Sequence, residues 1–172
     1  MFREDYFLRQ IEQVTAAVGE ILGLARLERY PQALAEVDAG LQRFLGLNLS
    51  LVTALTASEL VALTRFGERL DVSRLVVLAE LLQAEGDIYI ARGQPAEAAE
   101  RWLKALELML EVAFASEANL LAAEPRISAL AGRLAGVELP ADLGEWLAHY
   151  QAAALAAASA LGSAGAPAEA GE

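Results

Sequence analysis

One stretch limits the fold more than any other: a glycine turn between two helical patterns, from Gly86 to Leu106. Gly86 and Tyr89 are three residues apart and therefore share one helix face. Gly93 is expected to end that helix, because glycine adopts the left-handed C-terminal conformation without steric cost. Pro95 suits the first turn of the next helix, where its missing N–H would have no partner. The second helix places small residues beside a large ring: Ala98, Trp102, Ala105 and Leu106. The stretch therefore predicts two antiparallel helices in close contact.

These positions resemble one tetratricopeptide repeat, a helix–turn–helix unit of about 34 residues. The glycines, aromatic residues and small residues fall where that family places them, and Leu82 stands where the family often has tryptophan. Two residues depart from the pattern: Glu85 replaces the usual leucine beside the glycine, and Leu110 replaces the closing proline. The alternative is an ordinary helical hairpin with a glycine turn.

A weaker copy of the pattern lies earlier in the chain, at 14–45. Its residues with the matching spacing are Ala33, Val37, Gly40 and Leu41. The copies are 105 − 40 = 65 residues apart, whereas a tandem array repeats at about 34 residues. We therefore expect an insert at 46–75 between the first hairpin and a second hairpin at 76–114. The insert is predicted to hold two short helices, Leu51–Leu55 and Ala57–Phe66.

Polar residues mark where these helices begin and end. Thr56 and Glu59 have the spacing of a capping box. In this motif the side chain of each residue accepts a hydrogen bond from the backbone N–H of the other. Ser50 is the candidate cap of the first insert helix, and Asp71 is the candidate cap of the long helix that follows. Gly67 is expected to end the second insert helix.

The last third of the chain is less patterned. C-terminal helices are expected at 117–161, opened by Pro125 and Pro140. From Gly162 the chain consists mostly of Gly, Ala, Pro, Ser and Glu, so 162–172 is predicted to be a disordered tail. The sequence thus predicts one all-α domain at 3–161, built from antiparallel helical hairpins with an inserted pair of short helices.

A second resemblance covers about residues 1–150. Its opening motif is Asp5-Tyr6, Arg9 and Ile11-Glu12-Gln13. Later segments, Leu45-Gly46-Leu47, Leu70-Asp71 and Leu78-Ala79-Glu80-Leu81-Leu82, fit as well. The chain is similar here to a family of short, uncharacterised bacterial proteins. This resemblance implies a helical, tetratricopeptide-like protein without assigned catalytic or binding residues. Alanines replace what would be a third hairpin in that family.

Composition excludes several classes of function. The net charge is −11, which disfavours binding to nucleic acid and to anionic membranes. There is no cysteine, so the chain can form neither a disulfide nor a cysteine-ligated metal centre. The N-terminus Met1-Phe2-Arg3-Glu4-Asp5 lacks the basic and apolar regions of a signal peptide. We therefore expect a cytoplasmic protein.

The chain lacks the common sequence motifs of catalysis, cofactor binding and metal binding. The one histidine, His149, follows Glu145 by four residues, and a di-iron bundle needs two Glu-x-x-His pairs. No glycine-rich phosphate loop or Gly-x-Ser-x-Gly motif occurs. The expectation is a protein that is not an enzyme, with no catalytic residues, no cofactor and no metal.

A candidate partner groove follows from the tetratricopeptide resemblance, since such arrays bind partners along the first helix of each hairpin. The matching residues of the second hairpin are Glu80, Gln83, Asp87 and Ile90. This acidic face would favour a basic or neutral peptide. We therefore expect a protein–protein interaction module whose partner is an unknown protein or peptide. The alternative is a self-associating homodimer without a peptide groove.

The matching face of the first hairpin is apolar and includes Val18 and Leu22. An apolar face of this kind needs a cover. The predicted cover is the insert, through Leu51, Val52, Leu55, Leu60 and Leu63. A second copy of the chain is the other candidate cover.

Overall fold

A computed structural model describes residues 2–164. Within this range the chain is all-α, as expected, apart from one β-hairpin whose two strands have two residues each. Its elements are α1 (Phe2–Arg26), α2 (Tyr30–Leu45), α3 (Leu49–Ala54), α4 (Ala57–Leu63), β1 (Arg65–Phe66), β2 (Arg69–Leu70), α5 (Val72–Ala91), α6 (Pro95–Phe114), α7 (Glu117–Ala122), α8 (Glu124–Arg133) and α9 (Ala141–Ala164).

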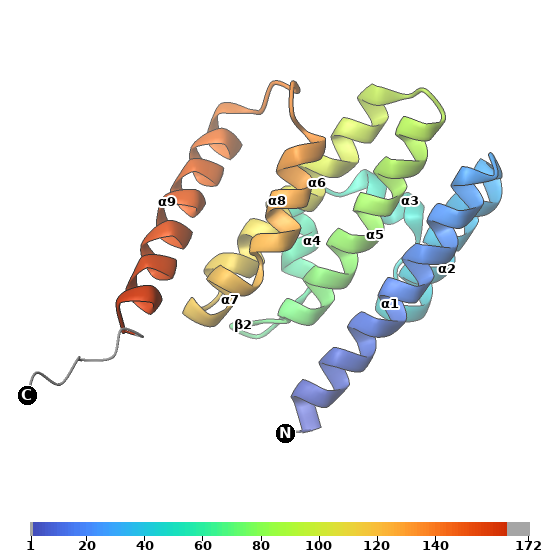
Figure 1. Ribbon diagram of the computed structural model, residues 1–172. Helices are drawn as coiled ribbons and strands as arrows, with labels where there is room; N and C mark the ends of the chain where they lie inside the picture. Colours follow the sequence, from blue (N-terminus) through green and yellow to red (C-terminus); the bar gives the residue numbers. More distant parts are fainter. Residues whose placement is uncertain (1, 165–172) are drawn as a thin grey trace, which may run out of the picture.

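The long helices form two layers around α5. Helices α1, α5 and α8 lie side by side at the front of Figure 1, with α2 and α6 behind them. α5 packs against α1, α2 and α6, and residues 75–79 at its start are buried without a break. A helix that is apolar all round belongs in the middle of a core. α5 is therefore the central helix of the fold.

The α5–α6 hairpin shows the close contact that its sequence predicted. Gly93 ends the turn with φ +75°, a conformation that glycine adopts without strain. The indole of Trp102 lies directly against Gly86, where a Cβ atom would stand 2.6 Å from the ring's Cδ1. Trp102 is 6% exposed, and Ala98 and Ala105 beside it are buried. The missing side chain at Gly86 is what lets the two helices approach.

The insert differs from the prediction in its details. The side chain of Asn48, not Ser50, caps α3 by accepting the N–H of Leu51 at 2.8 Å. The capping box of Thr56 and Glu59 at α4 is confirmed. α4 ends at Leu63 rather than Phe66, and β1 and β2 pair in antiparallel register around Gly67, whose φ is +64°. The predicted helix end at Gly67 is thus a hairpin turn.

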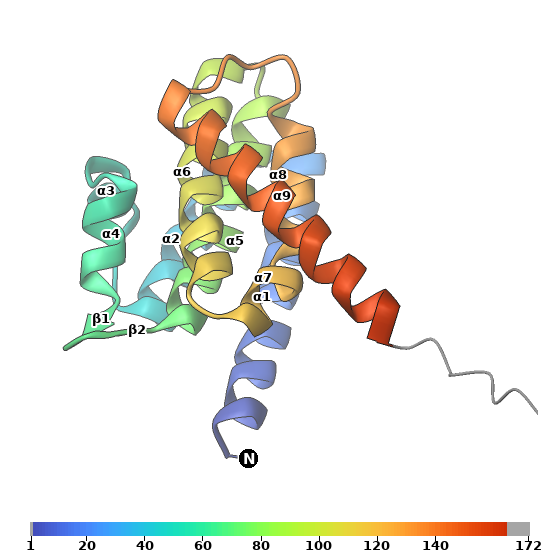
Figure 2. The ribbon, with the colours of Figure 1, turned by 90° about the vertical axis from the view of Figure 1, so that its left-hand side faces the viewer.

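The prediction that the insert covers the apolar face of α1 is wrong. α3 packs against α2, and α4 packs against α6. Figures 1 and 2 show the insert behind α2 and α6, on the other side of the fold from α1. Val18 is half-buried against the core of its own chain instead. Of the insert leucines, Leu60 is buried, while Leu51 and Leu63 are 40% and 51% exposed.

Lys104 explains why the insert stays on α6. Its ammonium group donates hydrogen bonds to the carbonyl oxygens of Val52, Thr53 and Leu55, at 3.1, 3.1 and 2.7 Å. These oxygens are left without helical partners at the end of α3. A cation is favoured at the C-terminal end of a helix. Lys104 therefore holds the insert against α6.

The C-terminal third consists of α7, α8 and α9. α8 packs against α6, and α9 packs against α7 and α6. Leu143, Leu147, Tyr150 and Ala154 form the buried side of α9. The helix continues to Ala164, so the predicted tail does not begin at Gly162. Residues 165–172 lie outside the described range.

Candidate functional site

Two of the candidate groove residues of α5, Glu80 and Asp87, contact arginines of α8, which changes the charge of this face. Arg126 Nε lies 2.6 Å from Glu80 Oε1. Arg133 binds Asp87 with two hydrogen bonds, Nε to Oδ1 at 2.8 Å and Nη2 to Oδ2 at 2.9 Å. The hydrogen bond with Asp87 raises the pKa of Arg133 above its ordinary value. Glu80 and Asp87 are therefore paired carboxylates rather than an open acidic surface.

Asp87 also joins α5 to α6. The indole N–H of Trp102 donates to Asp87 Oδ1 at 3.1 Å and to the backbone oxygen of Gln83 at 3.3 Å. One carboxylate thus accepts hydrogen bonds from a tryptophan on α6 and an arginine on α8. Bidentate arginine–carboxylate contacts fix geometry as well as supplying energy. Asp87 positions three helices, and its oxygens are already occupied by protein donors.

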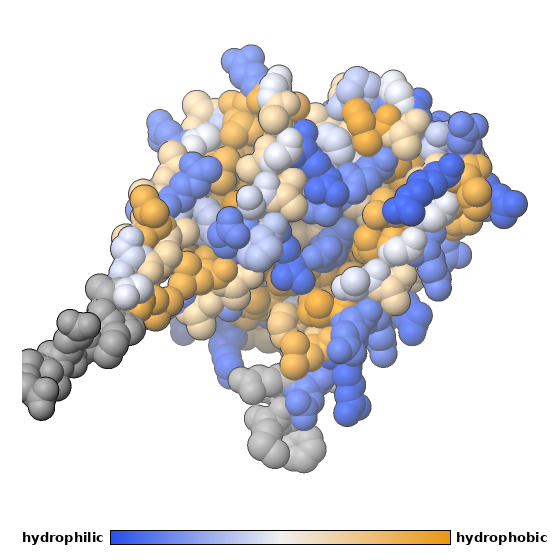
Figure 3. Space-filling model, viewed as in Figure 1, coloured by the Kyte–Doolittle hydropathy of each residue, from blue (hydrophilic) through white to orange (hydrophobic). Residues whose placement is uncertain are grey.

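The side chains that this face leaves accessible to a partner are partly apolar and partly polar. Ile90 is 45% exposed at the end of α5, and Val18 and Leu22 on α1 and Gln83 on α5 are half-buried. Figure 3 shows polar and apolar residues interspersed over the side on which α1, α5 and α8 lie. The four candidate residues do share one face of α5, but two of them serve the fold.

Sequence reasoning missed Arg126 and Arg133, although a signal was present. Each arginine lies 46 residues after its carboxylate partner. Glu80 and Asp87 are 7 residues apart, as are Arg126 and Arg133. Two helix faces with charges at equal spacing can pair when they pack side by side. The spacing could have suggested the pairing, but only contact between α5 and α8 fixes it.

A second polar cluster lies inside the α5–α6 hairpin, at the position where the tetratricopeptide pattern expects leucine. Glu85 is fully buried, and its Oε1 accepts a hydrogen bond from Arg101 Nε at 2.9 Å. The Arg101 guanidinium also lies over the ring of Tyr89, 5.6 Å from its centroid. Burial raises the pKa of the Glu85 carboxyl, and the Arg101 hydrogen bond opposes this shift. Such a pair specifies how two helices fit, because neither charge can stay buried alone.

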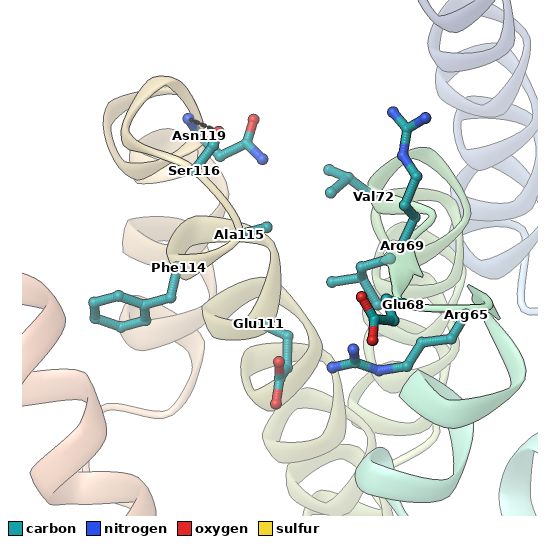
Figure 4. A pocket seen from close by; sticks show the side chains of 10 residues that line it. Arg65, Glu68, Arg69, Val72, Glu111, Phe114, Ala115, Ser116 and Asn119 are labelled. Atoms are coloured by element: carbon teal, nitrogen blue, oxygen red, sulfur yellow. Dashed lines mark hydrogen bonds between the residues drawn. The ribbon is translucent and has the colours of Figure 1, made fainter.

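Two cavities border the outer face of α6. One, of about 450 Å³, lies between α6 and the insert and is lined by Thr53, Thr56, Ala57, Glu100, Arg101, Leu103, Lys104 and Glu107. The other, of about 530 Å³, lies between the β-hairpin and the end of α6. Its lining includes Arg65, Glu68, Arg69, Glu111, Phe114 and Asn119 (Figure 4).

His149 lies on the exposed side of α9 and stacks on Phe114, with ring centroids 5.4 Å apart. Phe114 also stacks on Trp146 at 6.3 Å. Among residues 2–164 no group of three or more His, Asp or Glu side chains is arranged to hold a metal ion. The histidine is thus part of an aromatic cluster at the end of α6.

No protein-family model matches the chain, and neither the curated proteins nor the solved structures contain a significant match. In the described part of the chain, no helix combines the length and the apolar character needed to cross a membrane.

Proposed function

We propose that this chain is a non-catalytic protein–protein interaction module on a tetratricopeptide-like scaffold, acting in the cytoplasm. One observation carries the proposal: α1, α5 and α8 lie side by side and form one face from three separate segments of the chain. Tetratricopeptide arrays present such a face to extended peptides, and this support is an analogy of fold. The contact of Trp102 with Gly86 and the left-handed Gly93 support the scaffold itself.

The structure changes the kind of partner that suits this face. Arg126 and Arg133 neutralise Glu80 and Asp87, so the face does not select for a basic peptide. Ile90, Gln83 and Leu22 offer apolar and uncharged polar contacts. Partners that bind by apolar anchors within a polar rim fit such a surface.

Affinity capture from the native host, followed by mass spectrometry, tests this proposal. The test variant is Ile90→Glu, which places a charge on the exposed part of the face. The matched control is Leu63→Glu at the end of α4, a similarly exposed leucine on a helix that packs against α6. A partner retained by the control and lost by Ile90→Glu supports the proposal. Equal capture by both variants contradicts it.

A second function is favoured by the end of α9. Leu155 and Leu161 are 71% and 65% exposed, and no charged residue occurs between Gln151 and Ala164. An uncharged helix with exposed leucines is a surface for self-association. In that case the protein is a homodimer that buries α9, and light scattering on Leu155→Glu and on the parent chain distinguishes the two states.

A further inference from the structure

The helices α3 and α4 of the insert are too short to be stable by themselves. They have six and seven residues, whereas an isolated helix shorter than about 12–15 residues is at best marginally stable in water. Their order therefore depends on packing: α3 packs against α2, and α4 packs against α6. We call residues 48–64, which contain both helices and their capping residues, the strap (Figure 2).

Hydrogen bonds anchor the two ends of the strap. At its start, the backbone N–H of Leu49 donates to Asp38 Oδ1 on α2 at 2.6 Å. At its end, the backbone oxygen of Thr64 accepts the N–H of Asp71, the residue that caps α5, at 3.0 Å. The strap is thus tied to the fold at both ends, and other contacts hold its middle.

One side chain makes the polar contacts that hold the middle of the strap. The ammonium group of Lys104 donates to the carbonyl oxygens of Val52, Thr53 and Leu55, so all three of its N–H groups are used. Within residues 2–164, no other side chain from outside the strap forms a hydrogen bond or ion pair with residues 50–64. Lys104 is also the single lysine of the chain.

Acylation of this amine would remove the fastening. The reaction forms an amide bond between Nζ and the acyl carbon of a thioester, and it breaks the C–S bond. Of the two protons that the ammonium group loses, one goes to the leaving thiolate and the other to solvent. The product is uncharged and keeps one N–H, so at most one of the three carbonyl oxygens retains its donor. A helix end that loses a cationic donor loses a favourable interaction.

The surroundings of the amine suit this chemistry. Lys104 is half-buried, and it lines the cavity of about 450 Å³ between α6 and the insert, together with Thr53 and Thr56. A cavity of this size can take the acyl end of a small donor. The ammonium group becomes a nucleophile only when it gives up a proton, and each of its N–H groups is bound to the strap. Modification of the amine and opening of the strap are therefore coupled.

We propose that Lys104 is a modification site at which acylation by a thioester donor releases the strap from α6. Release exposes Val52, Leu60 and Val61, whose side chains are buried while the strap is fastened. The inference does not rest on the proposed interaction function, because the strap lies on the other side of the fold from α1 (Figures 1 and 2).

The single lysine allows a direct chemical test. The probe is S-acetyl-N-acetylcysteamine, a small thioester, which can acetylate two amines of the chain: Lys104 and the N-terminal amine. Peptide mass spectrometry separates the two products. Hydrogen–deuterium exchange then measures opening of the strap at the backbone amides of residues 49–63, with residues 75–88 of α5 as an internal reference. The test variant is Lys104→Gln, an uncharged mimic of the product, and the matched control is Arg92→Gln, which removes an exposed positive charge.

Acetylation of Lys104 should be about tenfold slower in the folded chain than in urea, because the amine must first leave the carbonyl oxygens. Residues 49–63 of the acetylated chain and of Lys104→Gln should exchange at least about tenfold faster than in the parent. Residues 75–88 should stay within about twofold of the parent, since the α5–α6 hairpin keeps its packing. Arg92→Gln should leave both segments unchanged.

Several outcomes would overturn the proposal. Absence of acetylation at Lys104 in the folded chain would show that it is not a modification site, and equal rates in the folded chain and in urea would show that the amine is not held. Unchanged exchange at residues 49–63 after acetylation would show that the strap does not depend on the charge. An equally large rise at residues 75–88 would indicate a general loss of stability instead of release. Because acetylation acts on chains that are already folded, the test does not depend on the folding of Lys104→Gln.

Discussion

The contact between Gly86 and Trp102 predicts that the cost of Gly86→Ala depends on whether the indole ring is present. A Cβ atom at Gly86 would overlap the indole nitrogen and lie 2.6 Å from Cδ1 of the ring. Forcing extra atoms into a packed core costs about 1–3 kcal/mol, and the buried indole has little room to move. Alanine is preferred to glycine inside a helix by about 1 kcal/mol. Taking the upper end of the first range, Gly86→Ala should destabilise the parent chain by about 2 kcal/mol.

The same substitution should have a different effect once the ring is gone. Trp102→Ala removes a buried aromatic side chain and should cost about 3–5 kcal/mol. In that background the new methyl group at 86 meets only the backbone oxygen of Ala98, at 3.1 Å. The helix preference for alanine then nearly cancels the remaining crowding, so Gly86→Ala should change stability by less than about 1 kcal/mol. The two sites are therefore coupled by about 2 kcal/mol.

Urea denaturation of the four proteins, followed by circular dichroism at 222 nm, measures this coupling. Equal destabilisation by Gly86→Ala in both backgrounds would show that the indole does not lie against Gly86. The close helix contact in the α5–α6 hairpin would then be wrong.

Three further changes test other parts of the structure by the same denaturation assay. Glu85→Leu should cost about 3–5 kcal/mol, because it leaves the buried Arg101 guanidinium with only its longer contact to the exposed Glu100, at 3.4 Å. Glu85→Leu combined with Arg101→Leu should be neutral or stabilising. A double variant no better than the single one would contradict the buried pair. Asn48→Ala should destabilise the protein by about 1 kcal/mol, because it removes the cap of α3, and Ser50→Ala should have almost no effect. A larger loss of stability for Ser50→Ala than for Asn48→Ala would identify Ser50 as the cap instead. Glu107→Gln should be more stable than the parent at pH 7, because burial raises the pKa of the Glu107 carboxyl in the folded state and its ionisation there destabilises the fold. This advantage should vanish below pH 4.5, the ordinary pKa, where the carboxyl is protonated in both states. A difference in stability that stays constant across pH would refute the raised pKa.

Local sequence patterns predict much of the fold. Gly86, Gly93 and Trp102 act on neighbours within one hairpin, so their roles follow from spacing and turn chemistry alone. The capping box at Thr56 is likewise a contact between residues three apart. In these cases both partners of the interaction lie within one hairpin or one helix turn.

The β-hairpin was missed because its strands have two residues each, too few to show an alternating pattern. Its turn did carry a signal: Gly67-Glu68 is a two-residue loop with glycine first, which suits a tight hairpin. Helix α9 passes Gly162 because its alanines favour helix more strongly than one glycine opposes it.

The candidate site was harder to predict because its decisive contacts are long-range. Glu80 and Asp87 were correctly placed together on one face of α5, yet their charge is cancelled by residues of α8 that lie 46 positions away. The side of the fold on which the insert packs depends on Lys104, whose three carbonyl partners lie about fifty residues earlier, at separations of 52, 51 and 49. No local pattern specifies such pairings.

Site-specific photo-crosslinking in the native host tests the interaction function most directly. A photo-reactive amino acid is placed at position 90, which is exposed on the face of α5, and in a separate chain at position 36, which is exposed on α2. The account predicts a crosslinked product from position 90 that contains a different protein, and no such product from position 36. Crosslinks from position 90 that join only two copies of this chain would contradict the account and establish self-association in its place.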